Sequence, residues 1–236
     1  MSATAPTGLP LELILRRAGA VLTTRGARPV VAHFGSAAAE LAVCVRAVGL
    51  VERSDLSTLA LEAPQAQLSA LMTRLAGASV SPGGLVSGGG AWWCGEAPDR
   101  VIVVCDQRIG RRLVESLHAD AARHVAVRDD SSEVAALGLL GRHTSKVLAA
   151  LGVYGQSRDP RQAAPFAHGS IDGIATTWLL QSDRQALALV PRQHAGEVWL
   201  SIERAGRALG ISCVGHEAAC RYALLERLRP AAPASF

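Results

Sequence analysis

Apolar and polar positions along the chain switch repeatedly between helical and strand-like spacing. Ser36 is a candidate N-cap for a run of small and apolar residues that Gly49 would close, which predicts a helix over 36–48. The same criteria predict further helices at 65–75 (after Pro64), 108–122, 143–151, 193–208 and 215–227. Strands are predicted at 59–62, 91–94, 101–105, 124–128, 135–140, 173–180 and 186–190. Residues 11–22 fit either a helix or a first pair of strands.

The order of these elements indicates an α+β protein. Strands 91–94 and 101–105 read as one hairpin, and strands 173–180 and 186–190 as a second. Hairpins interspersed with helices, without a regular strand–helix–strand rhythm, favour antiparallel sheets over a parallel sheet. Residues 81–90 are expected to be a turn, 155–165 a polar connection, and 1–10 and 229–236 loose ends.

Composition narrows the class of protein. A chain of 236 residues can bury roughly 70% of its unfolded surface, which is enough for one large or two small lobes. With 49% hydrophobic and 19% charged residues it is unlike a disordered chain. The sequence lacks an apolar run of about 18 residues and a basic, then apolar, leader, so neither a membrane span nor a secretory signal is expected. Five cysteines without C-x-x-C spacing fit reduced thiols, and a cytoplasmic protein is predicted.

The charge does not indicate a nucleic-acid partner. The net charge is only +4, and apart from Lys146 the basic side chains, histidines aside, are arginines. Arg108, Arg111 and Arg112 form the densest group, and they fit the solvated face of a predicted helix. No nucleic-acid binding is therefore expected.

Few local motifs carry chemistry. The glycine-rich run 83–90 has neither the G-x-x-x-x-G-K-[ST] nor the G-x-G-x-x-G order, so no phosphate-binding loop is predicted. The seven histidines are scattered along the sequence, so no metal site is predicted either. Trp92 and Trp93 are adjacent in a predicted strand, so their rings should point to opposite faces. One ring can then be core while the other lines a pocket, although core or interface positions for both also fit.

Segments spread along the chain resemble the aminomethyltransferase (glycine-cleavage T-protein) family. H-F-G-S-A-A-A-E from His33 is similar to the family's H-[YF]-G-x-x-x-x-E, and R-A-V-G-L-V-E-R-S from Arg46 to its R-x-x-x-G-L-x-[DE]-x-S. Further similar segments, in the family's order, are L-A-L-E-A-P, V-V-C-D-Q-R-I-G-R-R-L, D-S-S-E-V-A-A-L-G-L-L-G, V-P-R-Q-H-A-G-E-V-W and G-H-E-A-A-C-R-Y, which begin at Leu59, Val103, Asp130, Val190 and Gly215.

The resemblance implies a fold and a ligand. Members of this family bind tetrahydrofolate in a central cavity and move one-carbon units to or from it. The implied fold is two intertwined α/β lobes with antiparallel sheets around that cavity, formed by 1–52 with 128–236 and by 53–127. The family's third domain, a small β-barrel, is expected to be absent, as in the small subunit of heterotetrameric sarcosine oxidases.

Several positions depart from the family pattern. The family's acidic pair falls at Ser87, Gly88 or Gly89, and its pterin-pairing Glu falls at Leu187. Glu217 stands where the family has the arginine of G-x-R-D, and Cys105 stands where it has the Asn after V-V. In the last helix, only Arg221 keeps a charged residue at a charged family position. Losing one buried charged partner costs about 2–5 kcal/mol in binding, so the usual pose and reaction are not expected.

The sequence thus predicts a modified tetrahydrofolate site. Asp183 or Asp106 would be the replacement catalytic carboxylate, and the cofactor-binding residues would be Trp92, Trp93, Val104, Cys105, Trp178, Leu187 and Arg221. The other partners would be a small amine or one-carbon donor, and a protein partner or a second copy of the chain. Two alternatives stay open: a non-catalytic subunit, and an enzyme that reuses the cavity for a reaction without folate.

Overall fold

The computed structural model describes residues 11–26, 28–119, 125–154 and 163–228. The loose ends expected at 1–10 and 229–236 lie outside the described residues. So do the last residues of the helix expected to reach 122, the first residue of the strand expected from 124, and most of the connection expected at 155–165.

Helices and strands follow one another along the whole described chain. The helices are α1 (Glu12–Arg17), α2 (Ala37–Arg46), α3 (Gln65–Ala76), α4 (Gln107–Ala119), α5 (Thr144–Ala150), α6 (Ala195–Gly206) and α7 (His216–Arg227). The first strands are β1 (Val21–Arg25), β2 (Arg28–His33), β3 (Val48–Glu52), β4 (Leu56–Glu62), β5 (Leu85–Gly88), β6 (Ala91–Ala97) and β7 (Arg100–Asp106). They are followed by β8 (Ala126–Asp129), β9 (Val134–Leu140), β10 (Phe166–Ile171), β11 (Ile174–Ser182), β12 (Gln185–Pro191) and β13 (Ile211–Cys213).

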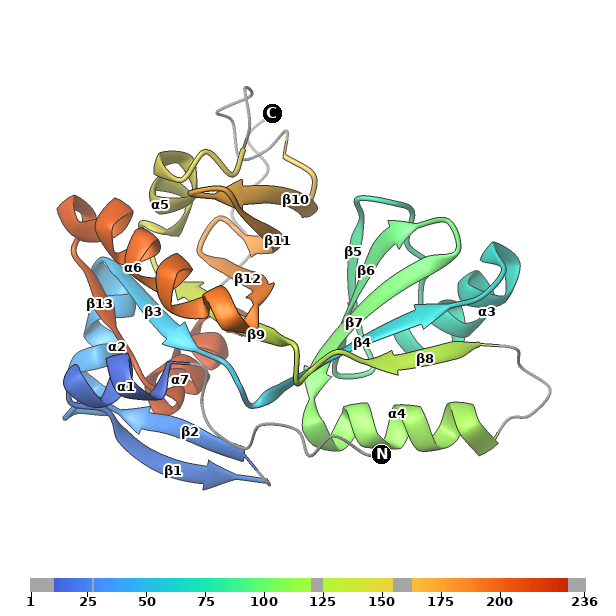
Figure 1. Ribbon diagram of the computed structural model, residues 1–236, viewed down its shortest axis with the longest axis horizontal. Helices are drawn as coiled ribbons and strands as arrows, with labels where there is room; N and C mark the ends of the chain where they lie inside the picture. Colours follow the sequence, from blue (N-terminus) through green and yellow to red (C-terminus); the bar gives the residue numbers. More distant parts are fainter. Residues whose placement is uncertain (1–10, 27, 120–124, 155–162, 229–236) are drawn as a thin grey trace.

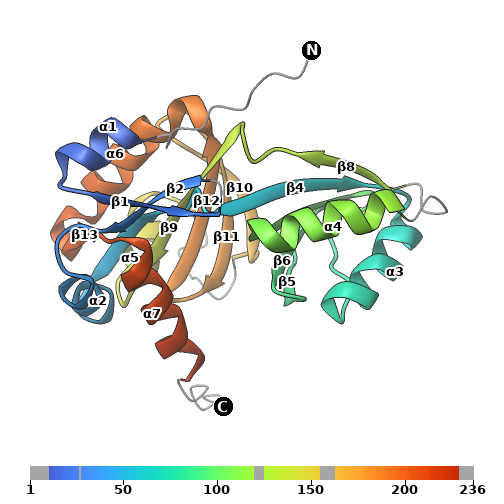
Figure 2. The same ribbon diagram turned by 90° about the horizontal axis from the view of Figure 1, so that it is seen from below.

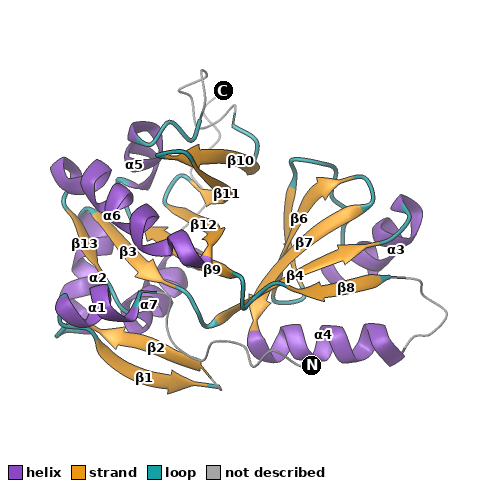
Figure 3. Ribbon diagram, in the orientation of Figure 1, coloured by secondary structure: helices purple, strands orange, loops and turns teal. Residues whose placement is uncertain are grey.

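Two larger sheets lie side by side, each with helices on its outer face (Figure 1 and Figure 3). One sheet has six strands in the order β10-β11-β12-β9-β3-β13, and the other has five in the order β5-β6-β7-β4-β8. Every pairing in them is antiparallel except β13 with β3, and β1 and β2 form a separate two-stranded hairpin. The described residues therefore form a mixed α/β fold with antiparallel sheets and no closed barrel, as the sequence predicts.

Alternation along β12 shows how the six-stranded sheet divides its two faces. Ala186, Ala188 and Val190 point into a core with Trp199 and other buried apolar residues of α1, α5 and α6. Leu187 and Leu189 point the other way, toward the five-stranded sheet. Because successive side chains in a strand face opposite sides, the apolar run of β12 is buried on both faces.

The five-stranded sheet is also covered on both faces. Trp93, Val101 and Val103 pack against the apolar sides of α3 and α4, which lie together beside this sheet in Figure 2. Val104 and Ile102, on the opposite face, pack against the six-stranded sheet. The two sheets thus share one apolar cluster, formed by Ala60, Cys94, Ile102, Val104, Ala136, Phe166, Leu179, Leu187 and Leu189.

Chain segments split between the two sheets. The strands β4 to β8 form the five-stranded sheet, whereas β3 and the strands from β9 onward form the six-stranded sheet. Among the described strands, only the links from β3 to β4 and from β8 to β9 connect the two sheets along the chain. The division into lobes 1–52 with 128–236 and 53–127 stays a prediction about domains.

Most helices and both hairpins lie where the sequence places them. Ser36 does cap α2, and its Oγ accepts a hydrogen bond from the Ala39 N–H at 3.4 Å. Residues 11–22 resolve into both alternatives, since α1 is followed by the start of β1. Gly49 does not end a helix, because it lies within β3, where Cys44 and Val214 would crowd any Cβ.

The segment predicted as a turn at 81–90 contains an edge strand. Its residues Leu85–Gly88 form β5, which pairs with β6. The intervening Gly89 and Gly90 have φ values of +61° and +76°, which suit the tight hairpin turns that glycine favours. The prediction of a turn over the whole segment was wrong, because the turn between β5 and β6 is confined to Gly89 and Gly90 and the residues before it pair with β6.

Candidate functional site

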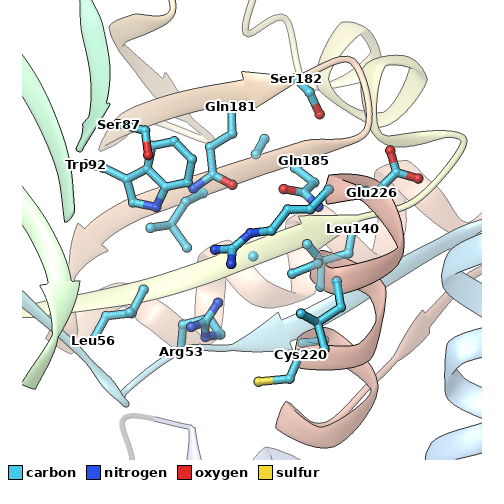
Figure 4. Close-up of a pocket in the computed structure, with 17 residues that line it drawn as sticks. Arg53, Leu56, Ser87, Trp92, Leu140, Gln181, Ser182, Gln185, Cys220 and Glu226 are labelled. Carbon is cyan, nitrogen blue, oxygen red and sulfur yellow. The ribbon is translucent and has the colours of Figure 1, made fainter. Parts of the chain in front are cut away.

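A pocket of about 720 Å³ opens on the inner face of the six-stranded sheet (Figure 4). Strands β9, β11 and β12 form its floor, α7 forms one side, and β5 and β6 of the five-stranded sheet form another. The link between β3 and β4 contributes Arg53, and the first residue of β4 contributes Leu56, at the boundary between the two sheets. Elements far apart in the sequence therefore build this site together.

The pocket wall combines an aromatic ring, apolar side chains and a polar rim. Trp92 is half-buried and contributes the aromatic surface, and Leu140 and Leu187 are apolar wall residues. The polar and charged lining residues are Arg53, Ser87, Gln181, Ser182, Gln185, Glu226 and Arg227. Such a mixture, mostly apolar with a few polar groups, is typical of sites for small organic ligands.

Arg53 is held at the pocket by a two-point ion pair. Its Nε lies 2.7 Å from Asp55 Oδ1, and its Nη2 lies 2.9 Å from Asp55 Oδ2. Burial alone would raise the pKa of Asp55, but the adjacent guanidinium outweighs it and lowers that pKa below its usual value. The Arg53 side chain remains 24% exposed, so the pair fixes a positive charge at the pocket edge.

Glu52, at the end of β3, is a buried carboxyl beside this pair. It is only 3% exposed, and burial raises its pKa to about 7. Ser54 donates a hydrogen bond to its Oε1, while Oε2 has no hydrogen-bond partner among the described residues. Glu52 therefore changes its charge near neutral pH.

Trp92 and Leu187 are the residues of the predicted cofactor set that line the pocket. Trp93 points to the opposite face of its strand, as expected, and its Nε1 donates to the Gly88 carbonyl at 3.1 Å. Val104 lies in the apolar cluster between the two sheets, behind the pocket wall.

The remaining predicted cofactor residues lie elsewhere. Cys105 is buried beneath α3 and α4, and Trp178 is buried in the core on the outer face of the six-stranded sheet. Arg221 is exposed on α7 and does not line the pocket. The structure therefore brings Trp92 and Leu187 together and separates them from these three side chains.

The two predicted catalytic carboxylates are also outside the pocket lining. Asp183 lies in the turn between β11 and β12, where its side chain is 73% exposed and lies 3.7 Å from Arg184. Asp106 ends β7, and its Oδ1 accepts a hydrogen bond of 2.8 Å from the Arg108 N–H at the start of α4. Their catalytic role stays a prediction, and Glu226 is the carboxylate that lines the pocket instead.

The three positions aligned with the family's acidic pair differ in whether a side chain fits there. Ser87 lines the pocket, so a side chain there borders the pocket space. A Cβ at Gly88 would lie 2.1 Å from the Ala76 carbonyl oxygen, and one at Gly89 would lie 2.5 Å from the Leu75 carbonyl oxygen. Only Ser87 has room for a side chain at the family's acidic position.

Sequence reasoning did not find Arg53, Gln181, Gln185 and Glu226. A weak signal exists on α7, where Ala219, Cys220, Ala223, Leu224 and Arg227 recur at helical spacing and all line the pocket. That spacing identifies one face of the helix. It does not reveal that the face borders a pocket.

Comparison with known proteins agrees with this architecture. No family model and no curated protein matches the sequence. Among solved structures, glycine cleavage system aminomethyltransferase T from Bartonella henselae is similar with a TM-score of 0.75 and 16% identity, over 96% of this chain and 64% of that chain. A chain of heterotetrameric sarcosine oxidase from Corynebacterium sp. U-96 is similar with a TM-score of 0.56 and 20% identity, over 75% of this chain and 93% of that chain.

The protein therefore has an α+β fold of the aminomethyltransferase type. It spans about 64% of the length of the Bartonella enzyme and nearly the whole of the sarcosine oxidase chain. The resemblance found in the sequence segments is confirmed at the level of the fold. Within the described residues, none of the helices is long and apolar enough to cross a membrane, and no cluster of His, Cys, Asp and Glu is placed to hold a metal ion.

Proposed function

We propose that this protein binds a reduced folate, tetrahydrofolate or a derivative, in the pocket between the two sheets. Its role would be one-carbon transfer at the aminomethyl or formaldehyde level, with an amine or one-carbon donor as second substrate. The observation that carries the proposal is the pocket itself, which joins the Trp92 ring to amide, carboxylate and guanidinium groups in an aminomethyltransferase-type fold.

The lining groups fit the chemistry of a pterin. A pterin is flat and alternates hydrogen-bond donors and acceptors along one edge. The indole of Trp92 offers a surface for its face, and the amides of Gln181 and Gln185 can both donate and accept. The carboxylate of Glu226, which lies 3.9 Å from Arg184, can accept N–H groups as the family's acidic residues would.

The cationic groups fit the acidic tail of a folate. Arg53 and Arg227 both line the pocket, and a guanidinium matches a carboxylate with two parallel hydrogen bonds. Asp55 accepts from Nε and Nη2 of Arg53, so a ligand carboxylate would bind Arg53 through Nη1 and the second N–H of Nη2. These side chains would bind and orient the ligand, whose reduced ring nitrogen supplies the attachment point for the one-carbon unit.

Titration of the purified protein with tetrahydrofolate tests this proposal. We expect quenching of tryptophan fluorescence and measurable heat, with affinity reduced at least about fivefold in Trp92→Ala because ring stacking contributes about 1 kcal/mol beyond burial. Arg221→Ala, on the outer side of α7, is the matched control and should bind like the wild type. Absence of both signals at millimolar tetrahydrofolate would rule the proposal out.

A second candidate function is that of a non-catalytic subunit. Leu224, Leu225 and Leu228 are exposed by 58%, 46% and 82% on or just after the last turns of α7, and Leu224 borders the pocket. The sarcosine oxidase chain with the same fold belongs to a heterotetramer. A larger chain that covers these leucines would then complete the pocket wall.

The oligomeric state in solution separates the two candidates. A partner-dependent subunit should self-associate when purified alone, and Leu225→Glu with Leu228→Glu should suppress that association in light scattering. A monodisperse wild-type monomer that turns over a one-carbon donor in the presence of tetrahydrofolate would exclude the subunit role.

A further inference from the structure

A thiol, an imidazole and a carboxylate form a contiguous chain at the edge of the pocket. Cys220 Sγ lies 3.1 Å from His216 Nε2, and His216 Nδ1 lies 3.7 Å from Asp55 Oδ2. His216 and Cys220 are four residues apart on α7, which places them on the same face of the helix. Asp55 reaches them from the link between β3 and β4.

The carboxylate end of this chain is fixed and ionised. Asp55 is 4% exposed, and both of its oxygens accept hydrogen bonds from Arg53. Its lowered pKa, described above, keeps it charged at neutral pH. A rigid carboxylate beside one ring nitrogen favours the imidazole tautomer with its proton on that nitrogen.

The imidazole is suited to accept a proton. His216 is 8% exposed, and burial lowers its pKa, so the ring is neutral at pH 7. The charged groups that act on it are Asp55 and Asp106, which favour the protonated ring, and Arg53 and Arg25, which oppose it. Nδ1 makes no hydrogen bond among the described residues, and the gap of 3.7 Å to Asp55 can close when the ring becomes charged.

The thiol is the accessible end of the chain. Cys220 is exposed and lines the pocket, and in Figure 4 its sulfur points toward the side on which Arg53 lies. Cys44, Cys94 and Cys105 are buried, and burial raises the pKa of each. Cys213 is half-buried, and burial raises its pKa as well. Among the cysteines, Cys220 alone combines exposure with a base in contact.

We infer that Cys220 is a nucleophile that takes aldehydes from the pocket, with His216 as its base and Asp55 as a positioning residue. The sulfur forms a bond to the aldehyde carbon, the electron pair of the C=O bond moves to oxygen, and the thiol proton passes through His216 to that oxygen. The product is a hemithioacetal, and the step needs no oxidant, leaving group or second substrate. Arg53, at the same edge of the pocket, places a positive charge near the developing oxyanion.

Native-state alkylation of the full chain tests the nucleophile. Iodoacetamide labelling followed by peptide mass spectrometry gives a rate for each cysteine, and Cys220 should react at least about tenfold faster than Cys213 at pH 7. His216→Gln should reduce the Cys220 rate at least about tenfold and shift the pH profile of that rate, because the group that takes the thiol proton is lost. Glu217→Gln, the neighbouring exposed residue, is the control and should leave both the rate and the profile unchanged.

Asp55→Asn separates positioning from folding. It should lower the Cys220 rate less than His216→Gln does and should shift the pH profile in the same direction, while circular dichroism confirms that the variant is folded. A Cys220 rate equal to that of Cys213, or a pH profile unchanged in His216→Gln, would overturn the inference.

Protection experiments test the ligand class. Benzaldehyde should slow alkylation of Cys220 reversibly, whereas benzyl alcohol, which lacks the electrophilic carbon, should not. No protection by the aldehyde, together with a stable acetyl adduct on Cys220 after p-nitrophenyl acetate treatment, would replace the aldehyde assignment with acyl chemistry. Because no folate is present in these assays, their failure leaves the folate proposal untouched, and failure of folate binding leaves this inference untouched.

Discussion

Glu52 provides a sharp test of the electrostatics at the boundary between the two sheets. Burial raises its pKa from 4.5 to about 7, so the folded protein holds a proton that the unfolded chain releases. Between these two pH values the folded state binds more protons than the unfolded state, and the free energy of unfolding therefore falls as pH rises. We predict that Glu52→Gln, which cannot ionise, removes this loss of stability.

The size of the effect follows from the two pKa values. At about 1.4 kcal/mol per pKa unit, the rise from 4.5 to about 7 corresponds to about 3 kcal/mol. Below pH 4.5 both states hold the proton and the term vanishes, whereas above pH 7 both release it and the full penalty applies. The stability gained by Glu52→Gln should grow from about 1 kcal/mol at pH 5 to about 3 kcal/mol at pH 8.

Urea unfolding from pH 5 to pH 8 measures the effect, provided that the wild type and the variant are compared at each pH. The comparison is needed because His216, whose pKa is lowered by burial, makes the fold more stable as pH rises in part of the same range. Glu115→Gln, on the exposed side of α4, is the matched control and should run parallel to the wild type. A constant difference between Glu52→Gln and the wild type over the whole range would refute the reasoning.

Three further predictions concern stability. Asp55→Ala should destabilise the protein by about 3 kcal/mol in urea unfolding, because it leaves the Arg53 charge without its buried partner. Gly88→Ala should lower the free energy of unfolding by more than about 2 kcal/mol, because its Cβ would lie 2.1 Å from a main-chain carbonyl oxygen. Gly169→Ala is the control: its Cβ would meet no atom within 4 Å, and it should change the free energy of unfolding by less than about 0.5 kcal/mol. Trp178→Ala should cost about 3–5 kcal/mol in the same measurement, because the side chain is 1% exposed in the core.

Local patterns in the sequence were sufficient for much of the secondary structure. The β6–β7 and β11–β12 hairpins were predicted from apolar strands around short polar turns, and both are present. The alternation rule also placed Trp92 and Trp93 on opposite faces of β6. These predictions succeed because hydrogen bonding and side-chain direction within a hairpin depend on neighbouring residues.

Short strands at the edges of the sheets were not predictable in the same way. The glycines on either side of β5 predict a turn there, and β13 is only three residues long. Such a strand exists because a partner strand satisfies its backbone groups, β6 for β5 and β3 for β13. Intrinsic strand preference depends strongly on that context, so local sequence gives little signal.

The site shows where sequence stops being sufficient. The segments that resemble aminomethyltransferases correctly predicted the fold. Trp92 and Leu187, predicted as cofactor-binding residues, line the pocket, and their role in binding stays a prediction. Asp183 and Asp106, the predicted replacement carboxylates, both lie outside the pocket lining. Proximity in sequence does not fix the direction of a side chain at the end of a strand or in a turn.

Local patterns along the chain establish the alternation of helices and hairpins and the apolar faces that must be buried, and the segments that resemble aminomethyltransferases predict the fold. Which polar groups meet depends on tertiary packing. Arg53 from the link between β3 and β4, Trp92 from the five-stranded sheet and Cys220 from α7 line one pocket because the two sheets pack together through a shared apolar cluster. Periodicity specifies which face of an element is apolar, but the packing of all the elements decides what that face meets.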